Sequence, residues 1–171
     1  MRCATLIAIG LPVFALAIAS VESLPTKLIY NASESAPIGL YWIDDQPAER
    51  GDYVLVRVPD RVRNLVVGRG YLPPDTPLIK RILGVDGDVV CRRNREILID
   101  GVTVAVAQIS DGLGREMPVW SGCYVLHERC VFLLQDHPNS FDSRYFGPVD
   151  RRLIIGRATP LRLPWRKRGP S

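Results

Sequence analysis

The chain has 171 residues and a formal net charge of +4, from 22 Lys and Arg against 18 Asp and Glu. This length has room for one domain with an appendage, and it excludes an eight-fold βα barrel or a large multidomain enzyme. The last eleven residues hold four basic residues and no acid, so they account for the whole net charge. A protein that binds nucleic acid usually spreads basic residues over one face of its fold. We therefore expect no nucleic-acid partner.

The N-terminal stretch 4–21 contains no charged residue and follows Arg2. As a helix it would span about 27 Å, close to the thickness of a bilayer core. Arg2 favours an N-terminus in the cytoplasm, so the remainder of the chain would lie across the membrane. The sequence predicts a membrane anchor over residues 1–23. A signal peptide cleaved near residues 17–19 is one alternative, and a buried core helix is another.

Residues 24–163 have the pattern of a mostly β domain. Short runs rich in β-branched and aromatic residues are separated by 14 Pro and 14 Gly. The expected strands are 53–58, 77–83, 88–91, 96–99, 102–106, 123–126, 131–134, 153–155 and 158–163. Asp100 and Gly101 between two of these runs predict a type I′ hairpin. Residues 61–67 predict a short helix, and residues 164–171 form a basic C-terminal tail.

The four cysteines are compatible with an exported domain, because disulfides persist outside the reducing cytosol. Cys123 and Cys130 are seven positions apart, and we expect them to close a short disulfide loop; Cys91 has no evident partner in the sequence. Free buried thiols are an alternative. A metal site formed by Cys123, His127 and Cys130 is another, but it falls one ligand short of a structural zinc site. We expect no metal and no cofactor.

Two segments combine residue types that support nucleophilic catalysis. Ser33 and Ser35 precede a Pro-x-Gly turn within residues 31–41, a segment that otherwise reads as a Ser-rich linker. Lys80 lies among apolar residues on an expected strand. Such a lysine either extends its ammonium to solvent or is held in apolar surroundings. In the second case desolvation lowers its pKa, and a value of about 8 would require roughly 3 kcal/mol of differential stabilisation of the neutral amine.

A third segment, residues 140–147, contains Asp142 and Arg144 and could simply be a polar turn. Together, however, the three segments and the apolar N-terminus resemble the type I signal peptidase family of serine proteases, and within it the TraF-type conjugative-transfer peptidases. The boxes that carry the resemblance are the apolar segment 4–21, Ser-x-Ser with its proline at 33–39, Lys-Arg-x-x-Gly-x-x-Gly-Asp at 80–88 and Ser-x-Asp-Ser-Arg-Tyr-Phe-Gly at 140–147. The resemblance implies a signal-peptidase-like β-barrel or β-sheet catalytic domain behind an N-terminal transmembrane helix.

The resemblance also implies a role for individual residues. These roles are Ser35 as nucleophile, Lys80 as general base, Asp142 as a candidate catalytic participant, Ser33 as a hydroxyl that helps the Ser35 amide bind the oxyanion, Ser140 as the hydroxyl that orients the lysine, and Arg144 as the partner of Asp142. In one respect the chain departs from the general family, because only Ala36 stands between Ser35 and the proline where the family has two residues. This leaves Ser33 and Ser35 as alternative nucleophiles, and the Ser-x-Ser spacing favours Ser35.

The resulting prediction is a membrane-anchored serine endopeptidase with a Ser/Lys dyad. Its substrate would be an exported precursor, a conjugative pilin by resemblance, cut with or without closure of the product into a ring. The alternatives are a housekeeping signal peptidase, a non-catalytic anchored scaffold of a conjugation or secretion apparatus, and a self-cleaving transcriptional regulator, although no DNA-binding helical domain is evident. A Ser-His-Asp triad through His137 or His127 is the competing catalytic arrangement.

Overall fold

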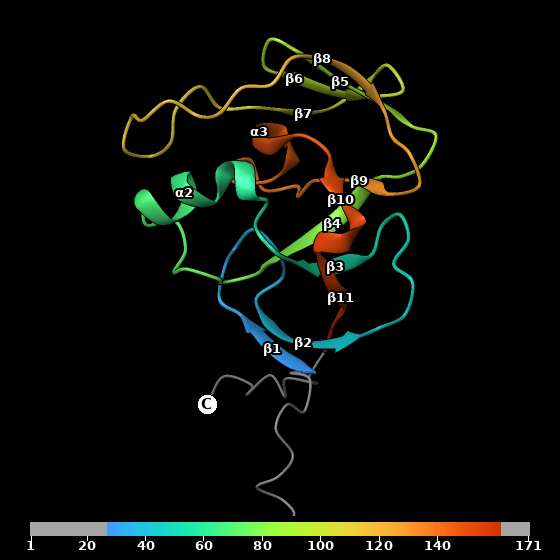
Figure 1. Cartoon of the computed structure of the whole chain (residues 1–171). Helices are drawn as coiled ribbons and strands as arrows, with labels where there is room; N and C mark the ends of the chain where they lie inside the picture. Colours follow the sequence, from blue (N-terminus) through green and yellow to red (C-terminus); the bar gives the residue numbers. More distant parts are fainter. Residues whose placement is uncertain (1–26, 162–171) are drawn as a thin grey trace, which may run out of the picture.

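The computed structural model describes residues 27–161, so the anchor expected at 1–23 and the tail expected at 164–171 lie outside the described residues. The elements, labelled in Figure 1, are β1 Leu28–Asn31, β2 Gly39–Asp44, β3 Tyr53–Val56, α2 Asp60–Gly68, β4 Leu78–Gly84, β5 Val89–Arg93, β6 Glu96–Ile99, β7 Val102–Val106, β8 Gly122–Val125, β9 Cys130–Leu133, α3 Ser143–Phe146, β10 Val149–Asp150, a short 3₁₀ turn Arg151–Leu153 and β11 Ile154–Pro160. The prediction of a mostly β domain is confirmed for this range. No helix between residues 27 and 161 is long and apolar enough to cross a membrane.

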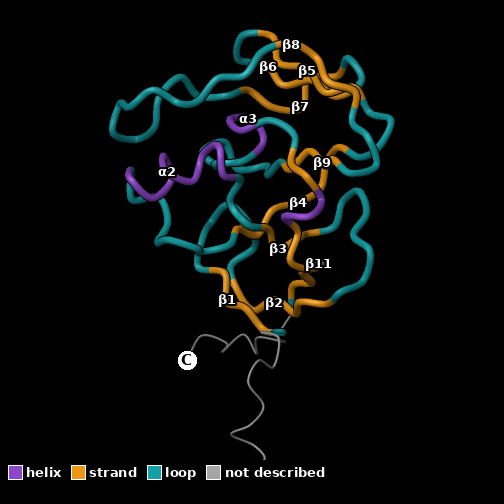
Figure 2. Tube along the Cα trace, viewed as in Figure 1, coloured by secondary structure: helices purple, strands orange, loops and turns teal. Residues whose placement is uncertain are grey.

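The strands form two antiparallel sheets (Figures 1 and 2). The larger sheet has the order β1-β2-β11-β3-β4-β9-β10, and the smaller sheet has the order β7-β6-β5-β8. The short helix α3 lies between them: Phe146 packs into the core of the larger sheet, and its neighbour Arg144 accepts a hydrogen bond at its carbonyl from Arg92 of β5. The residues around α3 are therefore held from both sides.

The chain passes from one sheet to the other through the turn between β4 and β5. A Cβ at Gly84 would lie 2.8 Å from Cβ of Phe132 and 2.9 Å from Leu126, so only glycine lets β4 approach β9 this closely. The Asp88 carboxylate then accepts hydrogen bonds from the Val85 amide at 2.9 Å and the Arg50 side chain at 2.7 Å. The Gly and Asp positions of the Lys-Arg box thus have a structural purpose, because they turn the chain immediately after the lysine-bearing strand.

The predicted helix and hairpin are both confirmed. Residues 61–67 lie within α2, and Asp100 (φ 49°) and Gly101 (φ 81°) form a left-handed two-residue turn between β6 and β7. The runs expected at 153–155 and 158–163 both fall on one continuous strand, β11 Ile154–Pro160, although residues 162 and 163 lie outside the described residues. The prediction missed this continuity because Gly156 and Arg157 interrupt the apolar pattern.

Strands β1 and β2 were not predicted, because the Ser-rich segment between them resembles a linker. They pair antiparallel, with Leu28 opposite Trp42 and Tyr30 opposite Leu40. One face of this hairpin is buried, with Tyr41 at 0 % exposure. The other face exposes Tyr30 at 63 % and Leu28 and Trp42 at about half. We call Leu28, Tyr30, Leu40 and Trp42 the outer β1–β2 face.

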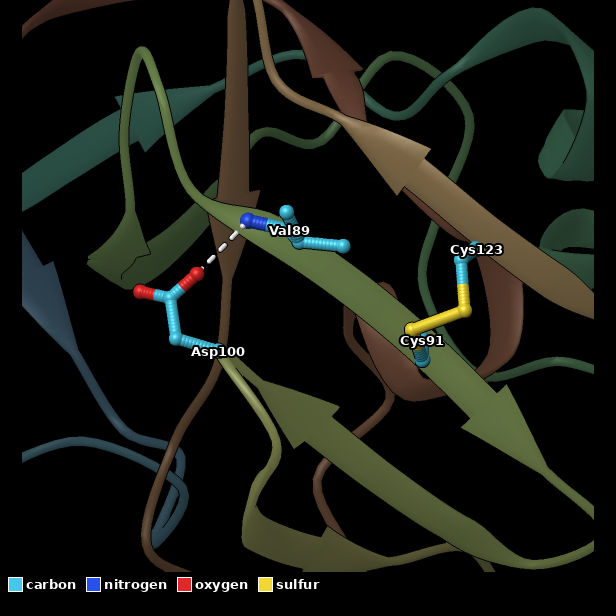
Figure 3. The surroundings of a disulfide bond; sticks show 4 residues. All are labelled: Val89, Cys91, Asp100 and Cys123. Carbon is cyan, nitrogen blue, oxygen red and sulfur yellow. Dashed lines mark hydrogen bonds between the residues drawn. A yellow bond between two sulfur atoms is a disulfide. The ribbon is translucent and has the colours of Figure 1, made fainter.

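The predicted disulfide between Cys123 and Cys130 is wrong. The structure joins Cys91 to Cys123, which lie directly opposite each other on β5 and β8 with their Cα atoms 4.0 Å apart (Figure 3). Cys130 is a free thiol on β9, in the other sheet. Nearness in sequence misled the prediction, since a disulfide requires neighbouring Cα atoms and β8 and β9 diverge into separate sheets. The alternative metal site is lost as well, because Cys123 is oxidised.

Candidate active site

The Ser-x-Ser segment is a fixed loop between β1 and β2. Asn31, the last residue of β1, donates from Nδ2 to the carbonyls of Ser33, Ala36 and Pro37 at 2.9–3.1 Å, and its Oδ1 accepts from the Ser33 amide at 3.1 Å. The Tyr41 hydroxyl donates to the Pro37 carbonyl at 2.9 Å. The loop conformation is therefore set by side chains of the two flanking strands, and the serines do not move as a free linker would.

The three segments singled out in the sequence meet around one amine. Lys80 is only 3 % exposed, and its Nζ lies 2.8 Å from Oγ of Ser140 and 3.5 Å from Oγ of Ser35. The Ser33 hydroxyl lies 2.8 Å from that of Ser35 and also accepts the Ser35 backbone amide at 3.2 Å. Of the two serines, Ser35 is the one within hydrogen-bonding reach of the lysine.

The surroundings of Lys80 favour its neutral form. Burial lowers the pKa of Lys80 from 10.5 to about 8, the negative charge of Asp142 opposes this shift, and the positive charge of Arg144 adds to it. Burial dominates because a buried ammonium loses its hydration. A lysine with this pKa is half deprotonated at about pH 8, so a base is available at physiological pH.

Asp142 and Arg144 form a buried ion pair beneath this site. Arg144 Nε lies 2.8 Å from Asp142 Oδ1, and the two side chains are 2 % and 0 % exposed. Arg144 also donates to the carbonyls of Gln135 at 2.6 Å and Pro138 at 3.0 Å. The second Asp142 oxygen accepts from the Gln135 amide at 3.1 Å. Both carboxylate oxygens are thus engaged in holding the segment that carries Ser140.

His137 does not complete a triad. Its Nδ1 accepts the backbone amide of Asn139 at 3.2 Å, which makes it a turn-capping residue. Because Arg144 and Gln135 occupy the Asp142 oxygens, that carboxylate does not orient an imidazole, as a triad requires.

Sequence reasoning missed two residues that support the site, Asn31 and Gln135. Gln135 donates from its side chain to the Ile79 carbonyl at 3.2 Å, next to Lys80, and it is 4 % exposed. An asparagine two residues before a serine is a recognisable turn signal. Gln135 has no comparable signal, because its importance comes only from the neighbours that the fold supplies.

Ser35 lies in the wall of two cavities. The first has a volume of about 480 Å³ and also includes Lys80, Ser140 and apolar side chains such as Leu72 and Phe141. The second has a volume of about 440 Å³ and lies toward Tyr53, Gln135 and His137. Of the two serines, Ser35 lines both cavities and Ser33 lines only the first.

Comparisons with known proteins place the chain in a family. A model of the family described as signal peptidase, peptidase S26, matches residues 2–162, and the chain belongs to this family. Among its relatives is a plasmid transfer protein TraF of Escherichia coli, 34 % identical and covering 79 % of this chain and 82 % of its own length. A conjugal transfer protein TraF of Agrobacterium fabrum is 33 % identical, with coverages of 77 % and 80 %.

Two further proteins are more distant. A mitochondrial ATP-independent inner membrane protease subunit 1b of Arabidopsis thaliana is 32 % identical over 73 % of this chain and 56 % of its own. A signal peptidase I crystal structure from Enterococcus faecalis V583 is 21 % identical and covers 67 % of this chain and 98 % of its own, with a TM-score of 0.38. Membership of the signal peptidase family rests on the family model and on the TraF relatives.

Proposed function

We propose that this protein is a membrane-anchored serine endopeptidase in which Ser35 is the nucleophile and Lys80 is the general base. The observation that carries the proposal is the position of the buried Lys80 amine, between the hydroxyls of Ser35 and Ser140. A serine hydroxyl is a weak nucleophile until a nearby base removes its proton. The lowered pKa of Lys80, about 8, supplies a base that can do so.

In the proposed reaction the neutral Lys80 amine takes the Ser35 proton as Oγ attacks the carbonyl carbon of the substrate. The oxyanion then accepts hydrogen bonds from the Ser35 amide and from the Ser33 hydroxyl, each worth roughly 3 kcal/mol in the transition state. The Ser33 hydroxyl, which accepts the Ser35 amide in the free protein, turns toward the oxyanion in this step. The Lys80 ammonium gives its proton to the leaving amine, and an acyl-enzyme remains on Ser35.

Ser140, Asp142 and Arg144 act in this proposal as positioning residues. Ser140 orients the lysine through their 2.8 Å hydrogen bond. Asp142 transfers no proton, because both of its oxygens are engaged with Arg144 and Gln135. Its charge also opposes part of the desolvation of Lys80, which keeps the pKa of the base from falling further.

The proposed location is the inner membrane, with the catalytic domain on the periplasmic side. The uncharged segment 4–21 precedes β1 in sequence. The outer β1–β2 face exposes aromatic and aliphatic side chains on the hairpin that carries the serine loop. Exposed aromatic residues are frequent where a protein meets the membrane interface. A serine at this position would meet precursors close to the membrane.

The proposed substrate is an exported pilin precursor of a conjugation system, and two relatives named for plasmid or conjugal transfer support it. The fate of the acyl-enzyme depends on its acceptor. Water gives a linear product, and the N-terminal amine of the same pilin gives a ring that is lighter by one water molecule.

The test is incubation of the full-length protein, in membranes, with a pilin precursor, followed by intact-mass analysis of the product. We expect one defined cut, lost in Ser35→Ala and Lys80→Ala and retained in Ser121→Ala, a matched change at an exposed serine before β8. Loss in Ser33→Ala but not in Ser35→Ala would transfer the nucleophile role to Ser33. Cleavage of a general signal-bearing precursor but not of pilin would favour the housekeeping alternative, and no cleavage of either would favour the scaffold.

A further inference from the structure

The connection between β7 and β8 contains a compact loop, residues 107–117, that reaches from the smaller sheet toward the first cavity beside Ser35. Compact surface loops of this length whose ends lie close together are frequently functional. The loop is closed by a bridge between Ser110 and Glu116 and by a hydrogen bond from the Met117 amide to the Ile109 carbonyl at 2.9 Å. We call it the 107–117 arm.

Asp111 organises the 107–117 arm. Its carboxylate accepts from the amides of Leu113 and Arg115, each at 2.9 Å, and from Nε of Arg115 at 2.7 Å. It also accepts the hydroxyl of Tyr71, in the segment after α2, at 2.5 Å. These hydrogen bonds, of which the one from Tyr71 contributes most, hold the pKa of Asp111 well below its usual range. The Asp111 carboxylate therefore remains charged at all physiological pH values.

Tyr71 connects the arm to the cavity that contains Ser35 and Lys80, because its side chain is part of the cavity wall. Its ring lies 5.5 Å from that of Phe141, which stacks on Tyr145 at 5.7 Å with nearly parallel planes. The arm holds this second tyrosine too, since the Gln108 amide donates to the Tyr145 hydroxyl at 3.0 Å.

The two tyrosines therefore enclose Phe141, and each is hydrogen-bonded to the 107–117 arm. Phe141 stands in sequence between Ser140, which binds the lysine, and Asp142. Leu72, Pro77 and Leu78 line the same part of the cavity with apolar side chains, and Thr76 is the one polar residue between them. This part of the cavity suits an apolar substrate side chain, and the ring of Tyr71 limits the space available to it.

We infer that Tyr71, fixed by Asp111 of the 107–117 arm, is a specificity-determining residue that sets how large an apolar side chain of the peptide substrate the cavity accepts. This inference rests on the proposed peptidase function. It assigns substrate selection to a loop outside the three boxes that supply the catalytic groups, so chains with the same boxes and different arms would select different peptides.

The experiment compares peptides that differ only in one apolar residue near the cut, from alanine through leucine to phenylalanine, at each flanking position in turn. Tyr71→Ala should raise the ratio of kcat/KM for a bulky over a small residue about tenfold at one position, since a change in a hydrophobic pocket has effects of this size. Tyr71→Phe and Asp111→Asn keep the ring but weaken its anchor, and should raise KM with little change in kcat. Asp150→Asn, at a similar Asp–Arg pair away from the cavity, is the matched control.

Binding of the same peptides to Ser35→Ala protein, with and without Tyr71→Ala, measures the cavity in the absence of cleavage. A size preference that shifts in binding while no peptide is cut by the wild-type protein would reject the peptidase function, and Tyr71 would remain only as the residue that sets the size of the side chain bound in the cavity. Cleavage by the wild-type protein with an unchanged preference in Tyr71→Ala, supported by unchanged binding, would overturn the inference and keep the peptidase function.

Discussion

Replacing Lys80 by methionine should change how the stability of the protein depends on pH. Methionine keeps an unbranched apolar stem and removes the amine from a site that is 3 % exposed. In the wild type, the pKa of this lysine falls from 10.5 unfolded to about 8 folded. At about 1.4 kcal/mol per tenfold change in the proton equilibrium, this difference lowers the free energy of unfolding by roughly 3 kcal/mol at pH values below both pKa values.

The sign follows from proton counting. Between pH 8 and pH 10.5 the unfolded chain keeps the Lys80 proton and the folded protein has lost it, so the wild type gains stability as pH rises. Below pH 8 the free energy of unfolding of the wild type is lowered by the full cost of burying the Lys80 ammonium, and above pH 10.5 this cost is absent. The stability of the wild type relative to Lys80→Met should therefore rise by roughly 3 kcal/mol across the window. Lys80→Met also loses the hydrogen bond to Ser140, but this loss is the same at the low-pH and high-pH limits of the window and cancels from the change in relative stability.

Denaturant unfolding at a series of pH values, under non-reducing conditions, measures this difference. Ile79→Met, on the adjacent position of β4, changes no ionisable group and should give a pH-independent difference from the wild type. In the active protein, kcat/KM should rise through about pH 8 as the same amine loses its proton. A stability difference for Lys80→Met that stays flat across the window would refute the account of a desolvated base.

Three further changes test other parts of the site. Ser140→Ala removes the 2.8 Å partner of the lysine and should lower kcat about tenfold or more while the protein stays folded, as measured by peptide cleavage and circular dichroism. Arg144→Met leaves Asp142 charged and buried and should cost about 3–5 kcal/mol in denaturant unfolding, a loss that Asp142→Asn in the same chain should partly recover. Cys123→Ser removes the bond to Cys91 and should lower stability by about 2–4 kcal/mol, whereas Cys130→Ser should have little effect; equal losses from the two would contradict the disulfide assignment.

Most of the strands could be predicted from the sequence, because their short runs of β-branched residues and the Asp-Gly turn are local signals. It also brought Ser35, Lys80 and Ser140 into one hypothesis, through motifs that name residue types in a fixed order. The hairpin β1–β2 was missed because its strands are short and their polar, Ser-rich connection outweighs a brief alternation. The disulfide was misassigned because its partners are 32 residues apart and are neighbours only by strand pairing.

The parts of the site that escaped prediction depend on the folded neighbourhood. Gln135 and Tyr71 matter because of what lies beside them: a carbonyl of β4 in one case, and the carboxylate of Asp111 forty residues away in the other. No pattern along the chain encodes these contacts. The lowered pKa of Lys80 is only partly predictable from the sequence. The sequence indicates apolar surroundings, but only the fold determines that the ammonium does not reach solvent.

The place of β11 in the larger sheet has a consequence for when this protein becomes active. Within that sheet, the hairpin that carries Ser35 is linked to the strand that carries Lys80 through β11, the last strand of the described chain, and then β3. A nascent chain that does not yet include residues 154–160 lacks the strand that links the Ser35 hairpin to the rest of the sheet. The two halves of the proposed site are therefore brought together only once residues 154–160 have joined the sheet, so the site forms late in the synthesis of the described domain.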